Sequence, residues 1–99
     1  MSALMFVLAL EVDIHIAQSR SLKAKRQVVR SIVDASRRRF GVAAAEVDHL
    51  DMWQRAGLGF AAVSGQSRHA EEVIDEVERF VWSHPDVQVL SAARRWMDA

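Results

Sequence analysis

The sequence has no cysteine and only one proline among its 99 residues, and these absences exclude several classes of protein. Without cysteine there is no disulfide framework and no thiolate to act as a nucleophile or a metal ligand, which favours the cytoplasm. A chain of this length forms one domain, residues 1–99, with a small core and modest stability. Limited burial of this kind favours pairing with a second copy, so we expect a cytoplasmic homodimer.

Long apolar runs are also missing. The N-terminal apolar run, residues 3–10, is far shorter than the roughly 20 residues that a membrane-spanning helix needs. No basic residue precedes it, and Glu11 and Asp13 follow it without a small-residue cleavage site, so it does not resemble a signal peptide. The sequence therefore predicts no association with a membrane.

Acidic residues are nearly absent from one segment of a chain that has no net charge overall. Between Arg20 and Arg39, eight of the twenty residues are Lys or Arg, and the only acid is Asp34. The segment 66–86 is the opposite, with six acids against two arginines. Positive charge repeated along one surface is what a polyanion requires, so the first segment indicates a nucleic-acid partner.

The hydrophobic periodicities predict six elements in the order β-α-β-β-α-β. Alternate large apolar residues predict a strand over residues 6–16, and apolar residues at helical spacing predict helices over 22–40 and about 68–82. Ser19 or Ser21 can cap the first helix and Gly41 can end it, while Ser67 can cap the second helix and Pro85 ends it. The remaining strands are predicted over residues 42–48, 55–64 and 87–96.

This order predicts an α+β, ferredoxin-like fold, with a four-stranded antiparallel sheet and two helices on one of its faces. One side of the first strand should lie beneath the helices. The expected core comprises Phe6, Leu8, Leu10, Val12, Ile14, Val29, Ile32, Val33, Val73, Ile74, Val77 and Phe80. The open face of the sheet should carry Val7, Ala9, Glu11, Asp13 and His15.

The first helix presents basic residues on one side. Four of them fall within about 60° of one another at 100° per residue, and we call them the basic stripe: Lys23, Arg26, Arg30 and Arg37. The triplet Arg37–Arg39 exceeds what the helix dipole needs. The predicted RNA-binding residues are Lys23, Lys25, Arg26, Arg30, Arg37, Arg38 and Arg39. The alternative is a solvated face whose charges pair with the acids of the second helix.

A second group of polar residues lies at the predicted hairpin end, in the segment 46–55. We interpret it as a loop that recognises a partner or a shape, carried by Asp48, His49, Asp51, Trp53, Gln54 and Arg55. Asp48, His49 and Asp51 could also ligate a hard divalent ion, with Glu11, Asp13 and His15 nearby, but the spacing matches no metal motif and we assign no metal. A structural interpretation pairs Arg55 with Glu46 and places Trp53 over the end of the core.

No catalytic motif is recognisable. His15 and His49 could act as bases, but no serine stands in a nucleophile context such as Gly-x-Ser-x-Gly. The predicted strand over residues 6–16 carries acids at the positions where proteins that bind single-stranded RNA usually carry aromatic residues. The open sheet face therefore does not suit RNA. The sequence favours a non-enzymatic protein without a cofactor.

Two segments, 21–26 and 45–55, together with the order of elements, resemble the YlxP-like family of small bacterial proteins. The resemblance covers almost the whole chain and includes Ser21, Leu22, Lys23, Lys25, Arg26, Asp48, His49, Asp51, Trp53, Gln54 and Arg55. It implies a ferredoxin-like fold, a cytoplasmic bacterial protein and a role in ribosome biogenesis, because family members are encoded beside translation initiation and ribosome maturation factors. It implies no established activity. Gly57 departs from the bulkier residue usual in relatives.

The leading hypothesis is an accessory protein that binds structured RNA or a ribosomal particle through the basic helix. The alternative is a homodimeric module whose acidic open sheet face, around Glu11, Asp13, His15 and Asp48, binds a ligand, a metal or another protein.

Overall fold

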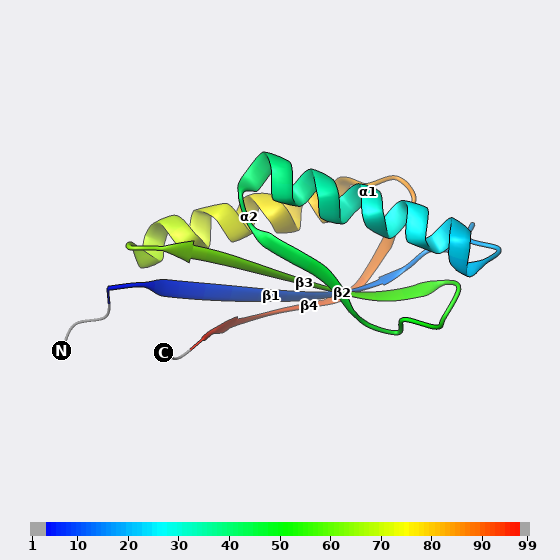
Figure 1. Cartoon of the computed structure of the whole chain (residues 1–99), viewed down its shortest axis with the longest axis horizontal. Coiled ribbons are helices and arrows are strands. Elements are labelled where there is room, and N and C mark those ends of the chain that lie inside the picture. The colour runs from blue at the N-terminus through cyan, green and yellow to red at the C-terminus, as the bar shows by residue number, and fades with distance from the viewer. Residues whose placement is uncertain (1–3, 98–99) are drawn as a thin grey trace.

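The computed structural model describes residues 4–97 as one antiparallel sheet covered on one side by two helices (Figure 1). The elements follow the predicted order: β1 (Phe6–His15), α1 (Leu22–Phe40), β2 (Ala43–Asp48), β3 (Arg55–Ser64), α2 (Ser67–Ser83) and β4 (Gln88–Trp96). The strands lie in the order β2-β3-β1-β4, and every neighbouring pair is antiparallel. The predicted ferredoxin-like fold is confirmed.

The register of β1 follows from its alternating pattern. Leu8, Leu10, Val12, Ile14 and Ile16 are at most 2% exposed and pack beneath the helices, as predicted. The partner residues on β3, including Leu58 and Phe60, are buried on the same side because each lies opposite an inward-facing residue of β1. Phe6, Val73 and Phe80 were predicted to be core residues but are only partly buried.

The ends of the helices have identifiable caps. The Ser21 hydroxyl accepts a hydrogen bond from the Ala24 amide at 3.0 Å, and Gly41 adopts a left-handed conformation (φ 66°) that ends α1. The predicted cap of α2 was wrong by one residue. Ser67 is the first residue of that helix, and Gln66 occupies the cap position without a side-chain hydrogen bond.

The molecule is elongated, with extents of 51, 21 and 19 Å, and the helices leave one face of the sheet uncovered (Figure 1). The loop between β2 and β3, residues 49–54, lies at the end of the molecule where α1 begins (Figure 1). We call it the β2–β3 loop. Neither of the helices within residues 4–97 is long and apolar enough to cross a membrane.

Candidate nucleic-acid interface

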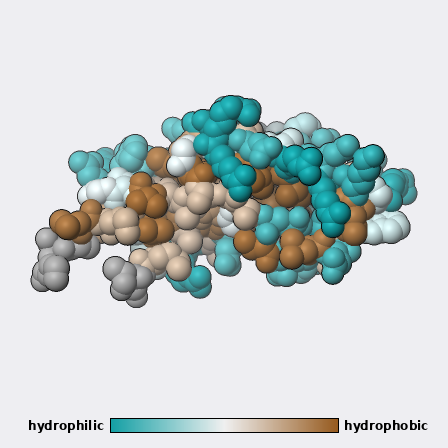
Figure 2. Space-filling view, in the orientation of Figure 1, coloured by the Kyte–Doolittle hydropathy of each residue, from teal (hydrophilic) through white to brown (hydrophobic). Residues whose placement is uncertain are grey.

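The outer side of α1 carries cations that the rest of the described chain leaves uncompensated. The helix buries Val29, Ile32 and Val33 against the sheet, so residues on the opposite side face outward. Lys23, Arg26, Arg30 and Arg38 are exposed and form no ion pair within residues 4–97. Figure 2 shows hydrophilic side chains gathered over this helix.

Three arginines line a shallow groove between α1 and the edge strand β2. The groove has a volume of about 360 Å³, and its polar lining includes Arg26, Arg30 and Arg37 together with Asp34 and Glu46. Arg37 donates a hydrogen bond to the Ala44 carbonyl at 2.6 Å, which fixes its guanidinium along the groove while leaving about half of the side chain exposed. The basic stripe therefore runs along a continuous edge between helix and sheet.

The acids of α2 do not neutralise this stripe. In the described part of the chain no ion pair joins the two helices, although pairing between them was the alternative interpretation of the sequence. Asp75 and Glu78 instead hold Arg94 of β4, at 2.8 and 3.1 Å. Partial burial lowers the pKa of Arg94, but hydrogen bonds to Asp75 and Glu78 more than offset this and leave the pKa raised. The helices meet instead through Phe40 and Phe80, whose ring centroids are 5.8 Å apart.

Besides Arg37, two of the predicted RNA-binding residues, Arg39 and Lys25, have contacts within the protein. The Arg39 guanidinium lies over the Phe40 and Phe80 rings, 5.2 and 4.9 Å from their centroids, so it stacks on the junction between the helices. Lys25 is fully buried, and its side chain cannot reach a phosphate at the surface. Its assignment to the RNA-binding set was wrong, because the position belongs to the inward side of α1.

Lys25 instead holds the β2–β3 loop against the start of α1. Its ammonium donates to the carbonyls of His49, Leu50 and Arg55, at 2.9, 3.1 and 3.2 Å. These three bonds use all three N–H groups of the ammonium. The Glu46 carboxylate lies 2.8 Å from the same ammonium and neutralises its charge as an ion pair. Glu46 was predicted to pair with Arg55, and that prediction was wrong.

Gln54 secures the other end of the loop. Its side-chain amide donates to the Ala17 and Ser19 carbonyls, at 3.2 and 3.1 Å, and the backbone carbonyl of Gln54 accepts from the Ile16 amide at 2.8 Å. The segment before α1 is thereby tied to the loop. Within the loop, the Met52 amide donates to the His49 carbonyl at 3.0 Å, which closes a turn.

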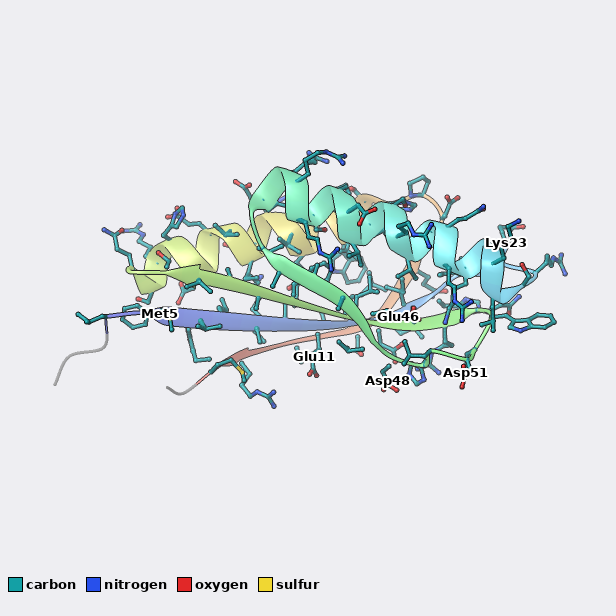
Figure 3. The ribbon with its side chains drawn as sticks, viewed as in Figure 1. Met5, Glu11, Lys23, Glu46, Asp48 and Asp51 are labelled. Atoms are coloured by element: carbon teal, nitrogen blue, oxygen red, sulfur yellow. The ribbon has the colours of Figure 1, made fainter. Side chains whose placement is uncertain are left out.

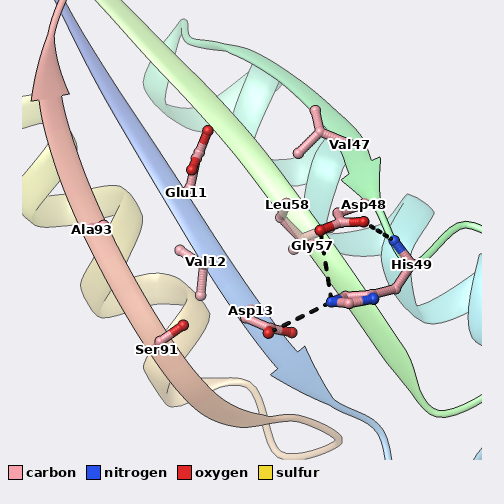
Figure 4. A pocket seen from close by; sticks show the side chains of 10 residues that line it. All are labelled: Glu11, Val12, Asp13, Val47, Asp48, His49, Gly57, Leu58, Ser91 and Ala93. Atoms are coloured by element: carbon pink, nitrogen blue, oxygen red, sulfur yellow. Dashed lines mark hydrogen bonds and ion pairs between the residues drawn. The ribbon is translucent and has the colours of Figure 1, made fainter.

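Arg55 pairs across the sheet with Asp13 of β1. Its guanidinium makes a bidentate contact with the Asp13 carboxylate, and the hydrogen bond to Asp13 is the main cause of a raised pKa for Arg55. The same guanidinium donates to Nε2 of His49 at 3.1 Å, which places the ring proton on Nδ1. The His49 ring also lies 3.7 Å from Asp13 and 3.8 Å from Asp48 (Figure 4).

Backbone features around His49 position the cluster formed by Asp13, Asp48, His49 and Arg55. His49 has φ 58°, a left-handed conformation that is uncommon for residues other than glycine, and its amide donates to the Asp48 carboxylate at 2.8 Å. The β2–β3 register shifts between Glu46 and Asp48, and this places Asp48 opposite Gly57. A Cβ atom at residue 57 would lie 2.7 Å from the Cβ of Asp48, so glycine makes room for the aspartate.

These residues border a pocket of about 370 Å³ on the open sheet face (Figure 4). Its polar lining is Glu11, Asp13, Asp48, His49 and Ser91. His15 is outside it, although the sequence grouped it with Glu11 and Asp13. Among residues 4–97 no group of three or more His, Asp or Glu side chains is placed to hold a metal ion. The Arg55 guanidinium already occupies both oxygens of Asp13.

The other predicted recognition residues lie on the solvent side of the loop. Asp51 is exposed, and Trp53 is 56% exposed, so the indole does not cover the end of the core as the structural interpretation proposed. The predicted recognition residues of the loop and its flanks thus divide into two groups. His49, Gln54 and Arg55 hold the structure together, whereas Asp51 and Trp53 remain available to a partner.

The fold, the β2–β3 loop held by Lys25 and Gln54, and the basic helix together define a small ferredoxin-like protein with a charged edge between helix and sheet. The chain belongs to the family described as "Protein of unknown function (DUF503)", whose model matches residues 7–94. It is similar to "Uncharacterized protein YlxP" of Bacillus subtilis (strain 168), with 31% identity over 86 residues. The match covers 87% of this chain and 94% of the relative. The resemblance seen in the sequence is confirmed.

Proposed function

We propose that this protein is a non-enzymatic, cytoplasmic accessory factor that binds structured RNA, or a ribosomal particle, through the basic stripe of α1. The observation that carries the proposal is the set of exposed cations on one side of a single helix, unpaired by the acids of α2, in a chain without net charge. The ribosomal particle is included because the family resemblance implies a role beside translation factors.

The contacts follow from the length of the stripe. Lys23 and Arg37 are fourteen residues apart, which corresponds to about 21 Å along a helix. Lys23, Arg26, Arg30 and Arg37 can therefore meet phosphates over several successive nucleotides, and Arg38 adds a flanking charge. Contacts of this kind position a protein on the RNA backbone without reading its sequence. The β2–β3 loop, at the beginning of the same helix, supplies recognition of shape.

A salt titration tests the proposal. Four phosphate contacts release counterions, so the logarithm of the affinity for ribosomal RNA fragments should fall with the logarithm of salt at a slope of about −3. Arg26→Gln with Arg30→Gln should bring that slope to about −1.5, because two of the four contacts are lost. Both side chains are exposed and one helical turn apart, so removing their mutual repulsion leaves the fold intact.

The matched control is Arg68→Gln with Arg79→Gln, which removes the same charge from exposed positions of α2. This variant should retain the slope of the unaltered protein. If both double variants flatten the slope equally, only net charge matters, and the stripe is not the site. If the unaltered protein does not bind at about 50 mM salt, the proposal is rejected.

The uncovered sheet face supports a second candidate, pairing with another copy of the chain. Val47 and Val63 are more than half exposed on this side of the sheet, and the residues between them are mostly small. Glu11 of β1 and Arg95 of β4 are both exposed there, so two copies related by a two-fold axis could place each arginine against the partner's acid. The pocket beside Asp48 would then lie at the edge of the dimer.

A further inference from the structure

The β2–β3 loop exposes large apolar side chains to an unusual degree. Leu50 and Trp53 are more than half exposed and Met52 is 45% exposed, so three of the four residues from 50 to 53 present apolar surface to solvent. Single exposed apolar residues are ordinary on protein surfaces. Three of them on one short turn form a patch, which indicates contact with a partner.

The exposure of Trp53 is imposed by the rigid attachment of the residues around it. The Lys25 ammonium fixes the carbonyls of His49, Leu50 and Arg55, and the Gln54 side chain is bonded to the segment before α1. The Met52 amide is in turn bonded to the His49 carbonyl, so the residues on both sides of Trp53 are held while its indole is 56% exposed. Burying a lysine to fix a loop costs free energy, since the charge of its ammonium must be desolvated. Its effect is to hold an aromatic surface in place before any partner arrives, which reduces the entropic cost of binding.

The charges beside the loop favour a nucleotide as the partner. Gln54 is bonded to the carbonyl of Ser19, the residue directly before Arg20, and Lys25 joins the loop to the first turns of α1. Arg20 and Lys23 are exposed in this region, and Figure 3 places Lys23 at the same end of the molecule as Asp51 of the loop. Aromatic surface beside cations is the combination that holds single-stranded nucleic acid.

We propose that Trp53 is a stacking platform for one unpaired base of the bound RNA, with Arg20 and Lys23 contacting the adjoining phosphates. This inference rests on the proposed function and adds the class of RNA: a stem whose end, bulge or loop presents an unpaired nucleotide. The basic stripe follows the paired stem, and the loop meets the unpaired base where the stem ends. The Asp51 carboxylate can accept a hydrogen bond from an amino group of that base.

Intrinsic fluorescence and affinity together test the stacking. In a Trp82→Phe/Trp96→Phe background only Trp53 remains, and Trp96→Phe keeps an aromatic ring against Phe6. A hairpin with an unpaired loop should quench this fluorescence, whereas a blunt duplex of equal length should not. In the otherwise unaltered protein, Trp53→Ala should weaken hairpin binding about 5- to 100-fold and duplex binding less than 2-fold. Trp53→Phe should restore most of the affinity.

Trp82→Ala is the matched control, because Trp82 is 58% exposed on α2, nearly the same as Trp53. It should leave binding of both RNAs unchanged. Hairpin binding that is unaffected by Trp53→Ala, or that occurs without quenching, overturns the inference while leaving the basic stripe intact. If Trp53→Ala abolishes co-sedimentation with ribosomal particles but leaves binding to protein-free RNA unchanged, the loop contacts a protein. That result would also overturn the stacking inference. Failure of both RNAs to bind the unaltered protein would reject the proposed function as well.

Discussion

Replacing Lys25 by methionine should destabilise the protein far more than replacing any other lysine or arginine of α1. Methionine preserves the length and the helix propensity of the side chain. It removes three hydrogen bonds to the carbonyls of His49, Leu50 and Arg55, and it leaves Glu46, whose side chain is 14% exposed, without a counter-charge. Breaking a buried pair in this way costs about 3 to 5 kcal/mol. A domain of this size has roughly 5 to 15 kcal/mol in total.

Urea unfolding of four proteins separates the charge from the hydrogen bonds. Adding Glu46→Gln to Lys25→Met removes the orphaned carboxylate, so the double variant should recover about 1 to 2 kcal/mol of the loss. Lys23→Met, two residues away and exposed, should change the free energy of unfolding by less than about 0.5 kcal/mol. The reasoning is refuted if Lys25→Met lies within about 1 kcal/mol of the unaltered protein, or if Glu46→Gln adds to the damage.

Three further outcomes are expected. Leu10→Ala should cost about 2 to 5 kcal/mol in urea unfolding, because Leu10 is fully buried at the centre of the sheet, and a cost under about 1 kcal/mol would contradict that position. Gly57→Ala should cost about 1 to 3 kcal/mol because its Cβ meets the Asp48 Cβ, whereas Gly59→Ala, which meets only the exposed Val47 side chain, should cost less. Sedimentation equilibrium at micromolar concentration should show a homodimer, and a sole 11.1 kDa species at high concentration would reject pairing through the open face.

The fold could be predicted because each element carries a local signal. The alternation of β1 determines which residues face the helices, and the caps Ser21 and Gly41 mark both ends of α1. The half-buried Phe6 and Phe80 were less predictable, since they lie near the ends of their elements and their burial depends on how the neighbouring elements cover them.

The burial of Lys25, unlike its partners, does have a signal in the sequence. At 100° per residue, position 25 falls between Val29 and Ile32, within the apolar side of α1 and well away from Lys23. Its burial could therefore have been predicted from spacing alone, but its charge placed it with the exposed cations. The buried Ser36 lies on the same side. The carbonyls that accept from Lys25 belong to His49, Leu50 and Arg55, 24 to 30 residues further along the chain, and the sequence of α1 does not indicate them.

Arg55 shows what a single sequence does not contain. The sequence interpretation pairs Arg55 with Glu46 across the predicted hairpin, but Glu46 lies opposite the buried Leu58 and contacts Lys25 beneath α1. Asp13 instead lies opposite Gly57, two residues from Arg55 on the same side of the sheet, and within reach of a long side chain. That neighbour depends on how β1 and β3 align, which is determined by tertiary packing.

Mapping the RNA surface on the isotopically labelled protein tests the central claim most directly, since at 11.1 kDa the chain suits amide chemical-shift measurements. During titration with a ribosomal RNA hairpin, the largest changes should fall in residues 20–38, along β2, and in the β2–β3 loop. Amides of α2 and those around Glu11, Ser91 and Ala93 on the open face should shift little. Changes concentrated on that open face, or no changes at about 50 mM salt, would contradict binding through the basic stripe.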